Sequence, residues 1–372
     1  SGTTMIIKRD YYLQQLISSK SNNLIKIVTG IRRSGKSFLL FNLFHNHLIE
    51  TGINEDHIIE IALDDRLNKN LRDPDVILQH IHERIVDNKL YYIILDEVQM
   101  IDEFTDVLNS LLHIRNADVY VTGSNSRFLS KDVVTEFRGR GDEIHLFPLS
   151  FAELYNSVGG DKFELWKSYY TYGGLPGILE LDSDKKKAAY LRSLHETVYL
   201  KDIIERNNLK NSEEFMELMR VMASCIGSPC NPSKLENTFK SVKNETLDRK
   251  TISKYLSYME DAFLIEKSMR YDIKGRKYIG TLSKYYFQDI GLRNALLNFR
   301  QVEENHIMEN VIYNELRLRG FCVDVGMVEA RTAKERKQLE VDFVANMATV
   351  DIISNQHLQC LMMQKESKNA LH

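Results

Sequence analysis

The stretch LIKIVTGIRRSGKS, residues 24–37, decides the fold of this chain. It starts as an apolar strand, Leu24–Thr29, and turns through two glycines, Gly30 and Gly35, with four residues between them, before Lys36 and Ser37. An apolar helix over 38–44 follows directly. A strand, a glycine-rich turn ending in Gly-Lys-Ser and a helix are the three parts of a phosphate-binding loop. The stretch therefore predicts a site for the phosphates of ATP.

Each residue type in this loop has a physical role. The glycines let backbone N–H groups curl around the β- and γ-phosphates, and the helix N-terminus adds its positive dipole end. Lys36 is expected to neutralise the phosphates and the Ser37 hydroxyl to ligate Mg²⁺. The expected nucleotide contacts are Gly30, Ile31, Arg32, Arg33, Ser34, Gly35, Lys36, Ser37 and Phe38. A glycine-rich turn that binds nothing is the alternative, which the flanking strand and helix disfavour.

A second motif, YYIILDE at 91–97, predicts the chemistry. Its apolar run is typical of a strand buried on both faces, with Asp96 and Glu97 at the carboxyl end. Ligands of open parallel sheets bind beyond those ends. Asp96 is expected to hold Mg²⁺ and Glu97 to deprotonate the attacking water. Two acids after a strand are common alone; their position about sixty residues after the loop makes the pair specific.

A third group of candidates follows the next apolar strand, Val119–Thr122. Asn125 is expected to contact the γ-phosphate and the water, with Ser124 as the second choice. Further on, Arg138 and Arg140 precede the last strand, and Arg140 is the candidate finger for the ATP of a neighbouring subunit. A solvated loop is an equally good explanation of these arginines.

Apolar strands alternate with helical patterns as far as about residue 149, after an amphipathic lead-in helix over 5–20. The other expected strands are Ile58–Leu63 and Ile144–Phe147. This alternation predicts an α/β fold, with a parallel sheet covered by helices on both faces. From 150 to about 208 the pattern is helical, interrupted by GGLP at 173–176.

Composition is that of an ordinary globular protein, and 372 residues suggest two or three domains. The net charge of −3 gives no overall attraction to nucleic acid or to an anionic membrane, so such binding requires a local patch. No apolar run is long enough to span a bilayer, so no membrane is expected. The four cysteines lack the spacing of a metal site, which favours free thiols and a cytoplasmic location. His195 stands alone and suggests no site.

The motifs of the chain, taken together, resemble those of a known family. GIRRSGKS, YYIILDEVQ, VTGSNS, RGRG, FPLSFAEL and YGGLPGIL follow in order the bacterial and archaeal AAA-type ATPases with an uncharacterised C-terminal domain, and YLKDIIER at 199–206 is also typical of them. The likeness covers about 5–345. It implies a P-loop ATPase core over 1–149, a helical lid over 150–209 and a winged helix over 210–300. A partial restriction-endonuclease-like segment over 301–345 and a polar, disorder-compatible tail over 346–372 complete the expected domains.

The residues also support a winged helix. Glu213–Cys225, Pro232–Val242 and Thr251–Phe263 have helical patterns, and a hairpin pattern over 264–288 follows. Between 247 and 284 there are nine Lys or Arg against five Asp or Glu. The candidate contacts to duplex DNA are Lys250, Lys254, Arg276 and Lys277. Packing on the ATPase itself or on a protein partner is the equally weighted alternative.

The C-terminal segment departs from the family pattern. A helix opening at Glu309 and containing Glu315, and a strand Leu339–Val344 with Glu340 and Asp342, are present. The later acid and lysine, Glu366 and Lys368, have no strand to carry them, which disfavours an active nuclease.

The sequence therefore predicts a Mg-ATP-dependent switch or motor acting on DNA or a protein. The alternative is a slow or non-hydrolysing, nucleotide-gated interaction module. A small-molecule kinase is disfavoured because Glu97 follows Asp96 directly and Asn125 resembles a γ-phosphate sensor.

Overall fold

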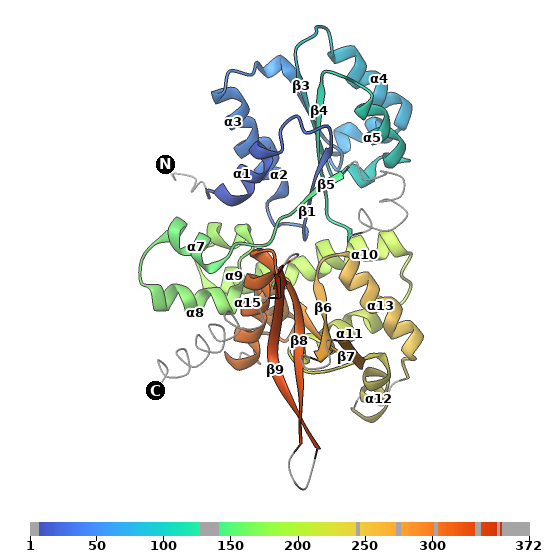
Figure 1. Ribbon diagram of the computed structural model, residues 1–372. Helices are drawn as coiled ribbons and strands as arrows, with labels where there is room; N and C mark the ends of the chain where they lie inside the picture. Colours follow the sequence, from blue (N-terminus) through green and yellow to red (C-terminus); the bar gives the residue numbers. More distant parts are fainter. Residues whose placement is uncertain are drawn as a thin grey trace. The chain divides into compact units, whose positions relative to one another are not determined.

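A computed structural model describes residues 7–126, 141–242, 246–272, 277–300, 304–331, 336–347 and 350–351. The chain forms two compact units. The first comprises Ser1–Leu165, Gly174–Asp182 and Asp261–Phe263, and the second Trp166–Gly173, Ser183–Glu260 and Leu264–His372. Each unit has its own five-stranded sheet (Figure 1).

The first unit alternates strands and helices, as the sequence predicts. Its elements are α1 (Asp10–Ser18), β1 (Ile25–Thr29), α2 (Lys36–Phe38), η1 (Leu39–Phe44), α3 (His45–Glu50), η2 (Glu55–His57), β2 (Ile58–Ala62), η3 (Arg66–Arg72), α4 (Pro74–Arg84), β3 (Tyr91–Asp96), η4 (Val98–Met100), α5 (Phe104–Leu112), β4 (Ala117–Gly123), β5 (Gly141–His145), α7 (Phe151–Val158) and η6 (Pro176–Glu180). The lead-in helix is shorter than predicted, covering Asp10–Ser18 rather than 5–20.

The first sheet is parallel, in the order β2-β3-β4-β1-β5. Strand β4 lies between β1 and β3, with Val28 opposite Thr122 and Leu95 opposite Val121. Because all five strands run the same way, their carboxyl ends meet at one edge. The phosphate loop after β1, the two acids after β3 and the polar segment after β4 therefore come to the same edge.

Both faces of this sheet are covered by helices, which confirms the α/β prediction (Figure 1). On one face, isoleucines and valines of the strands pack against Ile77 and Ile81 of α4 and Leu108 and Leu111 of α5. On the other face lie α1, α2 and α3, and the Phe44 ring is 4.6 Å from that of Tyr120. Burial on both faces explains why these strands are continuous apolar runs in the sequence.

The fifth strand lies three residues earlier than predicted. Strand β5 covers Gly141–His145, not Ile144–Phe147, and pairs with β1 from Ile25↔Gly141 to Thr29↔His145. As an edge strand it is partly exposed and polar, with the sequence GDEIH. The buried apolar residues Leu146 and Phe147 follow the strand instead of forming it. The prediction places the strand too late because the apolar residues follow it.

The second unit combines helices with a mixed sheet. Its elements are α8 (Lys162–Tyr172), α9 (Asp184–Leu194), η7 (His195–Tyr199), α10 (Leu200–Asn207), α11 (Ser212–Ser224), α12 (Pro232–Val242), α13 (Arg249–Asp261), β6 (Ile265–Asp272), β7 (Lys277–Phe287), α14 (Ile290–Leu296), α15 (Glu304–Leu318), β8 (Cys322–Arg331), β9 (Arg336–Met347) and β10 (Val350–Asp351), of which α8 and α13 extend across a boundary between the units. Three helices before an antiparallel hairpin, β6 and β7, match the sequence-based expectation.

The hairpin is part of a larger sheet, in the order β10-β9-β8-β6-β7. Strand β8 pairs in parallel with β6, Arg270 lying opposite Val325, and β9 is antiparallel to β8. Helix α15 begins at Glu304, five residues before the predicted start, and its Tyr313 ring stacks on Tyr286 at 4.3 Å. The predicted winged-helix segment, 210–300, and the predicted nuclease-like segment, 301–345, thus contribute strands to one sheet.

His195 is a buried histidine of this unit, with Nε2 2.7 Å from the carbonyl oxygen of Leu292. Its Nδ1 has no hydrogen-bond partner among the described residues. Burial lowers the pKa of His195 to about 4, and the charge of Arg220 adds to this, while the bond to Leu292 opposes it. The imidazole is therefore neutral in the folded protein near pH 7.

We expect His195 to make the folded state less stable as the pH falls. The unfolded chain takes up a proton at this histidine near pH 6.5, whereas the folded chain does so only near pH 4, so acid favours the unfolded state within this window. The expected loss is about 2 kcal/mol between pH 7 and pH 5. Urea unfolding of the wild type and of His195→Gln, which does not titrate, measures it as the difference between their pH dependences. Identical pH dependences would contradict the assignment.

Candidate nucleotide site

The phosphate loop connects β1 to α2, and its backbone explains its two glycines. A Cβ atom on Gly30 would lie 2.5 Å from the carbonyl oxygen of Leu146, closer than side-chain atoms pack. Gly35 has φ +99°, a left-handed conformation that favours glycine. The predicted turn therefore folds as a tight curl that other residues at these two positions would strain.

Lys36 lies inside this curl. Its side chain is buried, at 4% exposure, and its Nζ donates hydrogen bonds to the carbonyl oxygens of Gly30 (2.9 Å) and Ile31 (3.0 Å). Ile31 and Ser34 are buried, whereas Arg33 is exposed and Phe38 is 37% exposed. Backbone carbonyl oxygens of the loop therefore fix the position of the ammonium group, and its role toward phosphate stays a prediction.

Ser37 and Asp96 lie in direct contact across the edge of the sheet. The Ser37 hydroxyl donates to Oδ2 of Asp96 at 2.7 Å, and the Thr122 hydroxyl donates to Oδ1. Burial raises the pKa of Asp96, hydrogen bonds from Thr122 and Ser37 oppose the rise, and the charge of Glu97 adds to it. Two predicted metal ligands 59 residues apart in sequence are thus brought together.

These oxygen atoms fit Mg²⁺. This ion prefers oxygen ligands, and it binds through one or two protein groups together with phosphate oxygens and water. In the part of the chain that the structure describes, no cluster of three or more His, Cys, Asp or Glu could hold a metal by itself. A site that uses Ser37, Asp96 and the nucleotide's own oxygens agrees with both observations.

Glu97 is held by hydrogen bonds that the sequence does not predict. It is buried, with φ +53°, and its backbone N–H donates to the Thr122 hydroxyl at 2.8 Å. Oε2 accepts hydrogen bonds from the Ser124 hydroxyl at 3.1 Å and from the Gln99 amide. Thr122 thus positions both acids, and Ser124 and Gln99 fix the carboxylate.

The remaining candidates of this site are placed as follows. Asn125 is buried just beyond β4, next to Ser124, one of the residues that hydrogen-bond Glu97. Its role toward a γ-phosphate stays a prediction. Arg138 and Arg140 lie outside the described residues. The sequence does not predict the roles of Thr122 and Gln99. Thr122 could have been suspected from its position near the end of β4, and Gln99 from its position two residues after Glu97.

The candidate DNA contacts and the nuclease-like acids belong to the second unit. Lys250 and Lys254 are exposed on α13, Arg276 lies outside the described residues, and Lys277 begins β7.

Glu309 accepts from Nζ of Lys284 at 3.0 Å and from the hydroxyl of Tyr286 at 2.7 Å. Glu315 pairs with Arg319 at 3.1 Å on the same helix. Both acids therefore have basic or hydroxyl partners that account for them structurally.

Of the remaining nuclease-like residues, Glu340 and Asp342 lie on β9, which confirms the predicted strand. Glu366 and Lys368 lie outside the described residues.

Comparison with known proteins agrees with this geometry. A family model described as an AAA domain matches residues 22–155, and one described as a domain of unknown function (DUF8612) matches residues 163–303. An uncharacterized protein of Haemophilus influenzae is 32% identical over 374 residues, covering 99% of this chain and 90% of the relative. The chain belongs to the AAA-type P-loop ATPases.

Other relatives of this AAA-type ATPase are more distant. An uncharacterized protein of Methanocaldococcus jannaschii is 29% identical over 91% of this chain and 75% of its own length. Two solved structures are similar at 13% identity. The ORC1 protein of Aeropyrum pernix in complex with DNA has a TM-score of 0.33, with 78% of this chain and 92% of that chain covered. CDC6P of Pyrobaculum aerophilum has a TM-score of 0.35, with 84% and 97% covered.

Among the described residues, no helix has both the length and the apolar character that crossing a membrane would require.

Proposed function

We propose that this AAA-type ATPase binds ATP with Mg²⁺ at the phosphate loop and hydrolyses it to switch a module in the second unit. The observation that carries the proposal is the 2.7 Å hydrogen bond between Ser37 and Asp96. It brings the two oxygen ligands expected for Mg²⁺ to the same edge of the sheet as Lys36 and Glu97. Calorimetric ATP binding and phosphate release, each with Mg²⁺ and with EDTA, test it directly.

Each residue has a defined part in this proposal. Loop N–H groups and Lys36 hold the phosphates, while Ser37 and Asp96 would hold the magnesium ion, which when bound draws charge from the phosphate oxygens. Glu97 orients a water molecule and accepts its proton. Asn125 contacts the γ-phosphate, and Arg140 acts at a neighbouring subunit's ATP.

A slow nucleotide-gated module is the second candidate, and the contacts of Glu97 favour it. A carboxylate oxygen that accepts from both Ser124 and Gln99 has less capacity left for a water molecule. Turnover measured with and without DNA or a protein partner separates the two candidates. Capture of partners by Glu97→Gln protein loaded with ATP identifies what the module contacts.

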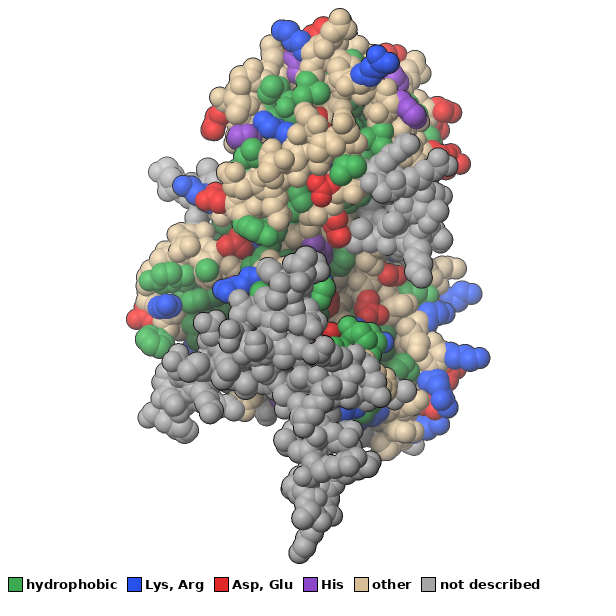
Figure 2. All heavy atoms as spheres, viewed as in Figure 1, with side chains coloured by type: hydrophobic (Ala, Val, Ile, Leu, Met, Phe, Trp, Pro, Cys, Tyr) green, Lys and Arg blue, Asp and Glu red, His purple; other side chains and the backbone are tan. Residues whose placement is uncertain are grey.

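The second unit supports a DNA-contacting winged helix as part of the proposal. Helices α11, α12 and α13 precede the β6–β7 hairpin. Figure 2 shows Lys and Arg side chains gathered over α12 and α13, at the lower right of the view. Lys234, Lys240, Arg249, Lys250 and Lys254 are exposed there. A local basic surface of this kind attracts phosphates although the whole chain is slightly acidic.

We expect binding to duplex DNA to weaken steeply with salt if this surface touches phosphates. Lys250 and Lys254 are four residues apart and so share a face of α13. Changing both to Glu should reduce the slope of log affinity against log salt by about 1.8, at about 0.9 for each contact. All DNA sequences should be affected alike, because phosphates carry no base information. Fluorescence anisotropy with labelled duplexes at several salt concentrations gives the slope.

The control carries the same charge change elsewhere in this unit. Lys185 and Lys186 are exposed on α9, and changing both to Glu should leave the slope unaltered. A wild type without DNA affinity at low salt would contradict the DNA assignment. The surface would then be a candidate for contact with an acidic protein.

A further inference from the structure

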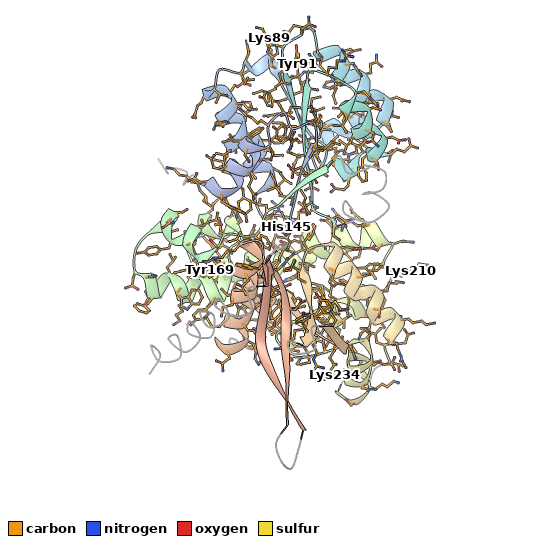
Figure 3. All side chains as sticks on the ribbon, viewed as in Figure 1. Lys89, Tyr91, His145, Tyr169, Lys210 and Lys234 are labelled. Carbon is orange, nitrogen blue, oxygen red and sulfur yellow. The ribbon has the colours of Figure 1, made fainter. Side chains whose placement is uncertain are left out.

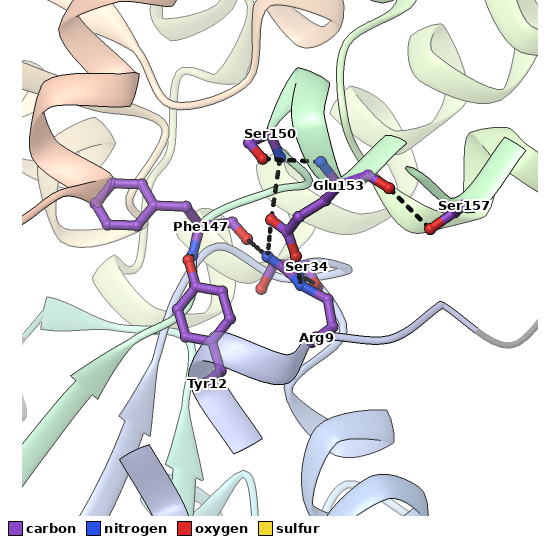
Figure 4. Close-up of polar contacts among 7 residues, drawn as sticks. All are labelled: Arg9, Tyr12, Ser34, Phe147, Ser150, Glu153 and Ser157. Carbon is purple, nitrogen blue, oxygen red and sulfur yellow. Dashed lines mark hydrogen bonds and ion pairs between the residues drawn. The ribbon is translucent and has the colours of Figure 1, made fainter. Parts of the chain in front are cut away.

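Arg9 is a buried cation of the first unit that the proposed function does not use. It lies just before α1 and is only 4% exposed. Its guanidinium binds Glu153 of α7 with two hydrogen bonds, from Nε at 2.7 Å and from Nη2 at 3.2 Å (Figure 4). Nη2 also donates to the carbonyl oxygen of Phe147 at 2.7 Å, and Nη1 to that of Ser34 at 3.3 Å. One side chain therefore joins three segments that are far apart in the sequence.

The geometry of these contacts requires arginine. A planar guanidinium offers five N–H donors in a fixed fork, whereas lysine is a point charge that cannot reproduce the paired bonds. The guanidinium also lies 4.7 Å from the centre of the Tyr12 ring. The Tyr12 hydroxyl in turn accepts from the N–H of Phe147 at 3.3 Å. Phe147 is thus held through both its carbonyl and its N–H group.

The contact with Ser34 reaches the phosphate loop itself. Ser34 lies between two residues with left-handed backbones, Arg33 at φ +74° and Gly35 at φ +99°. Its carbonyl shares a peptide group with the N–H of Gly35. In a trans peptide these two groups point in opposite directions, so a bond that holds the carbonyl also sets the direction of the N–H. Arg9 therefore orients one of the amide donors of the loop.

The contact with Glu153 reaches the start of α7. Glu153 is also part of a capping box. Its carboxylate accepts a hydrogen bond from the N–H of Ser150 at 3.2 Å, and the N–H of Glu153 donates to the Ser150 hydroxyl at 3.2 Å. The carboxylate that caps the helix is therefore the one that Arg9 holds. A change in the conformation of the phosphate loop would therefore affect the first turn of α7 through the side chain of Arg9.

We infer that Arg9 is a positioning residue for the nucleotide, which fixes the Gly35 amide in the phosphate loop and links the loop to the first turn of α7. The inference rests on the proposed ATP site. A loop that is already ordered binds phosphate without the cost of ordering it. Because coupling between two sites is reciprocal, ATP in the loop stabilises the first turn of α7.

The matched control is another buried ion pair of the first unit. Lys26 of β1 pairs with Asp118 of β4, near the start of each strand and so at the sheet edge opposite the loop. Asp118→Asn removes one charge of this pair, as Arg9→Gln removes one of the other. Both variants lose stability, but only Arg9→Gln disturbs the phosphate loop.

The experiment compares ATP affinity, KM, kcat and amide hydrogen exchange in the full chain of the wild type, Arg9→Gln, Arg9→Lys and Asp118→Asn. Arg9→Gln should raise the Kd and KM for ATP about tenfold, while kcat changes less than about threefold. Arg9→Lys keeps the charge and loses the fork, so it should show the same direction and serves as the test if Arg9→Gln does not fold. ATP should slow exchange at the amides of Glu153 and Leu154 in the wild type and Asp118→Asn, but not in Arg9→Gln.

The outcomes separate this inference from the proposed function. If the wild type binds ATP and the Arg9 variants bind it with the same affinity, the role of Arg9 is overturned and the proposed function stands. The same holds if Asp118→Asn loses as much ATP affinity as Arg9→Gln. Equal slowing at α7 in all variants overturns the link to that helix. A folded wild type that binds no ATP overturns the proposed function, and the role of Arg9 with it.

Discussion

Glu97→Gln protein should bind ATP as tightly as the wild type and hydrolyse it about 10²–10⁴-fold more slowly. The substitution keeps the shape of the side chain and removes the carboxylate that accepts the proton of water. The amide can still bond the Ser124 hydroxyl, so the local structure should persist. Steady-state phosphate release and calorimetric ATP binding measure the two quantities separately.

Glu103→Gln is the matched control for this prediction. Glu103 has the same side chain and a similar left-handed backbone, φ +52° against +53° at Glu97, but it is exposed at the start of α5. It should leave turnover unaltered. If Glu97→Gln also turns over within a few-fold of the wild type, Glu97 is not the base, and Asp96 becomes the next residue to test.

The phosphate loop and the acids could be predicted because their signals are local. Gly30, Gly35 and Lys36 are fixed by the path of a tight turn, and the apolar run before Asp96 reflects a strand buried on both faces. The common edge of the two motifs follows from the parallel direction of the strands alone. Neither argument needs the order of strands in the sheet.

What could not be predicted depends on neighbours that are distant in the sequence. Thr122 reaches both acids because β4 lies next to β3, and sequence alone does not give that order. Arg9 binds a carboxylate 144 positions away. Strand β8 joins β6 in parallel, a pairing without any local signature. Strand β5 was placed wrongly for a different reason. It is a partly exposed edge strand with polar side chains, and such a strand needs no apolar run in the sequence.

Lys36→Ala should weaken ATP binding about 30-fold to several-thousand-fold, the cost of removing one partner of a buried charged contact. We expect the ammonium group to be the charge that the loop directs at the phosphates. In the structure it donates hydrogen bonds to the carbonyl oxygens of Gly30 and Ile31 in the loop. Hydrolysis at micromolar ATP should disappear with the binding. Calorimetry or a fluorescent ATP analogue measures the affinity, and circular dichroism confirms that the variant folds.

Lys89→Ala removes the same charge at the opposite edge of the sheet and is the control. Lys89 is exposed in the loop before β3, at the tip labelled in Figure 3, whereas the phosphate loop follows the carboxyl end of β1. Its loss should leave ATP affinity unaltered, because a solvated charge at that distance is screened by salt. A folded Lys36→Ala protein with the affinity of the Lys89→Ala protein would show that this loop does not bind the phosphates of ATP. The role of Ser37 and Asp96 as magnesium ligands would then fail as well, since their proposed site is completed by the phosphate oxygens of the nucleotide.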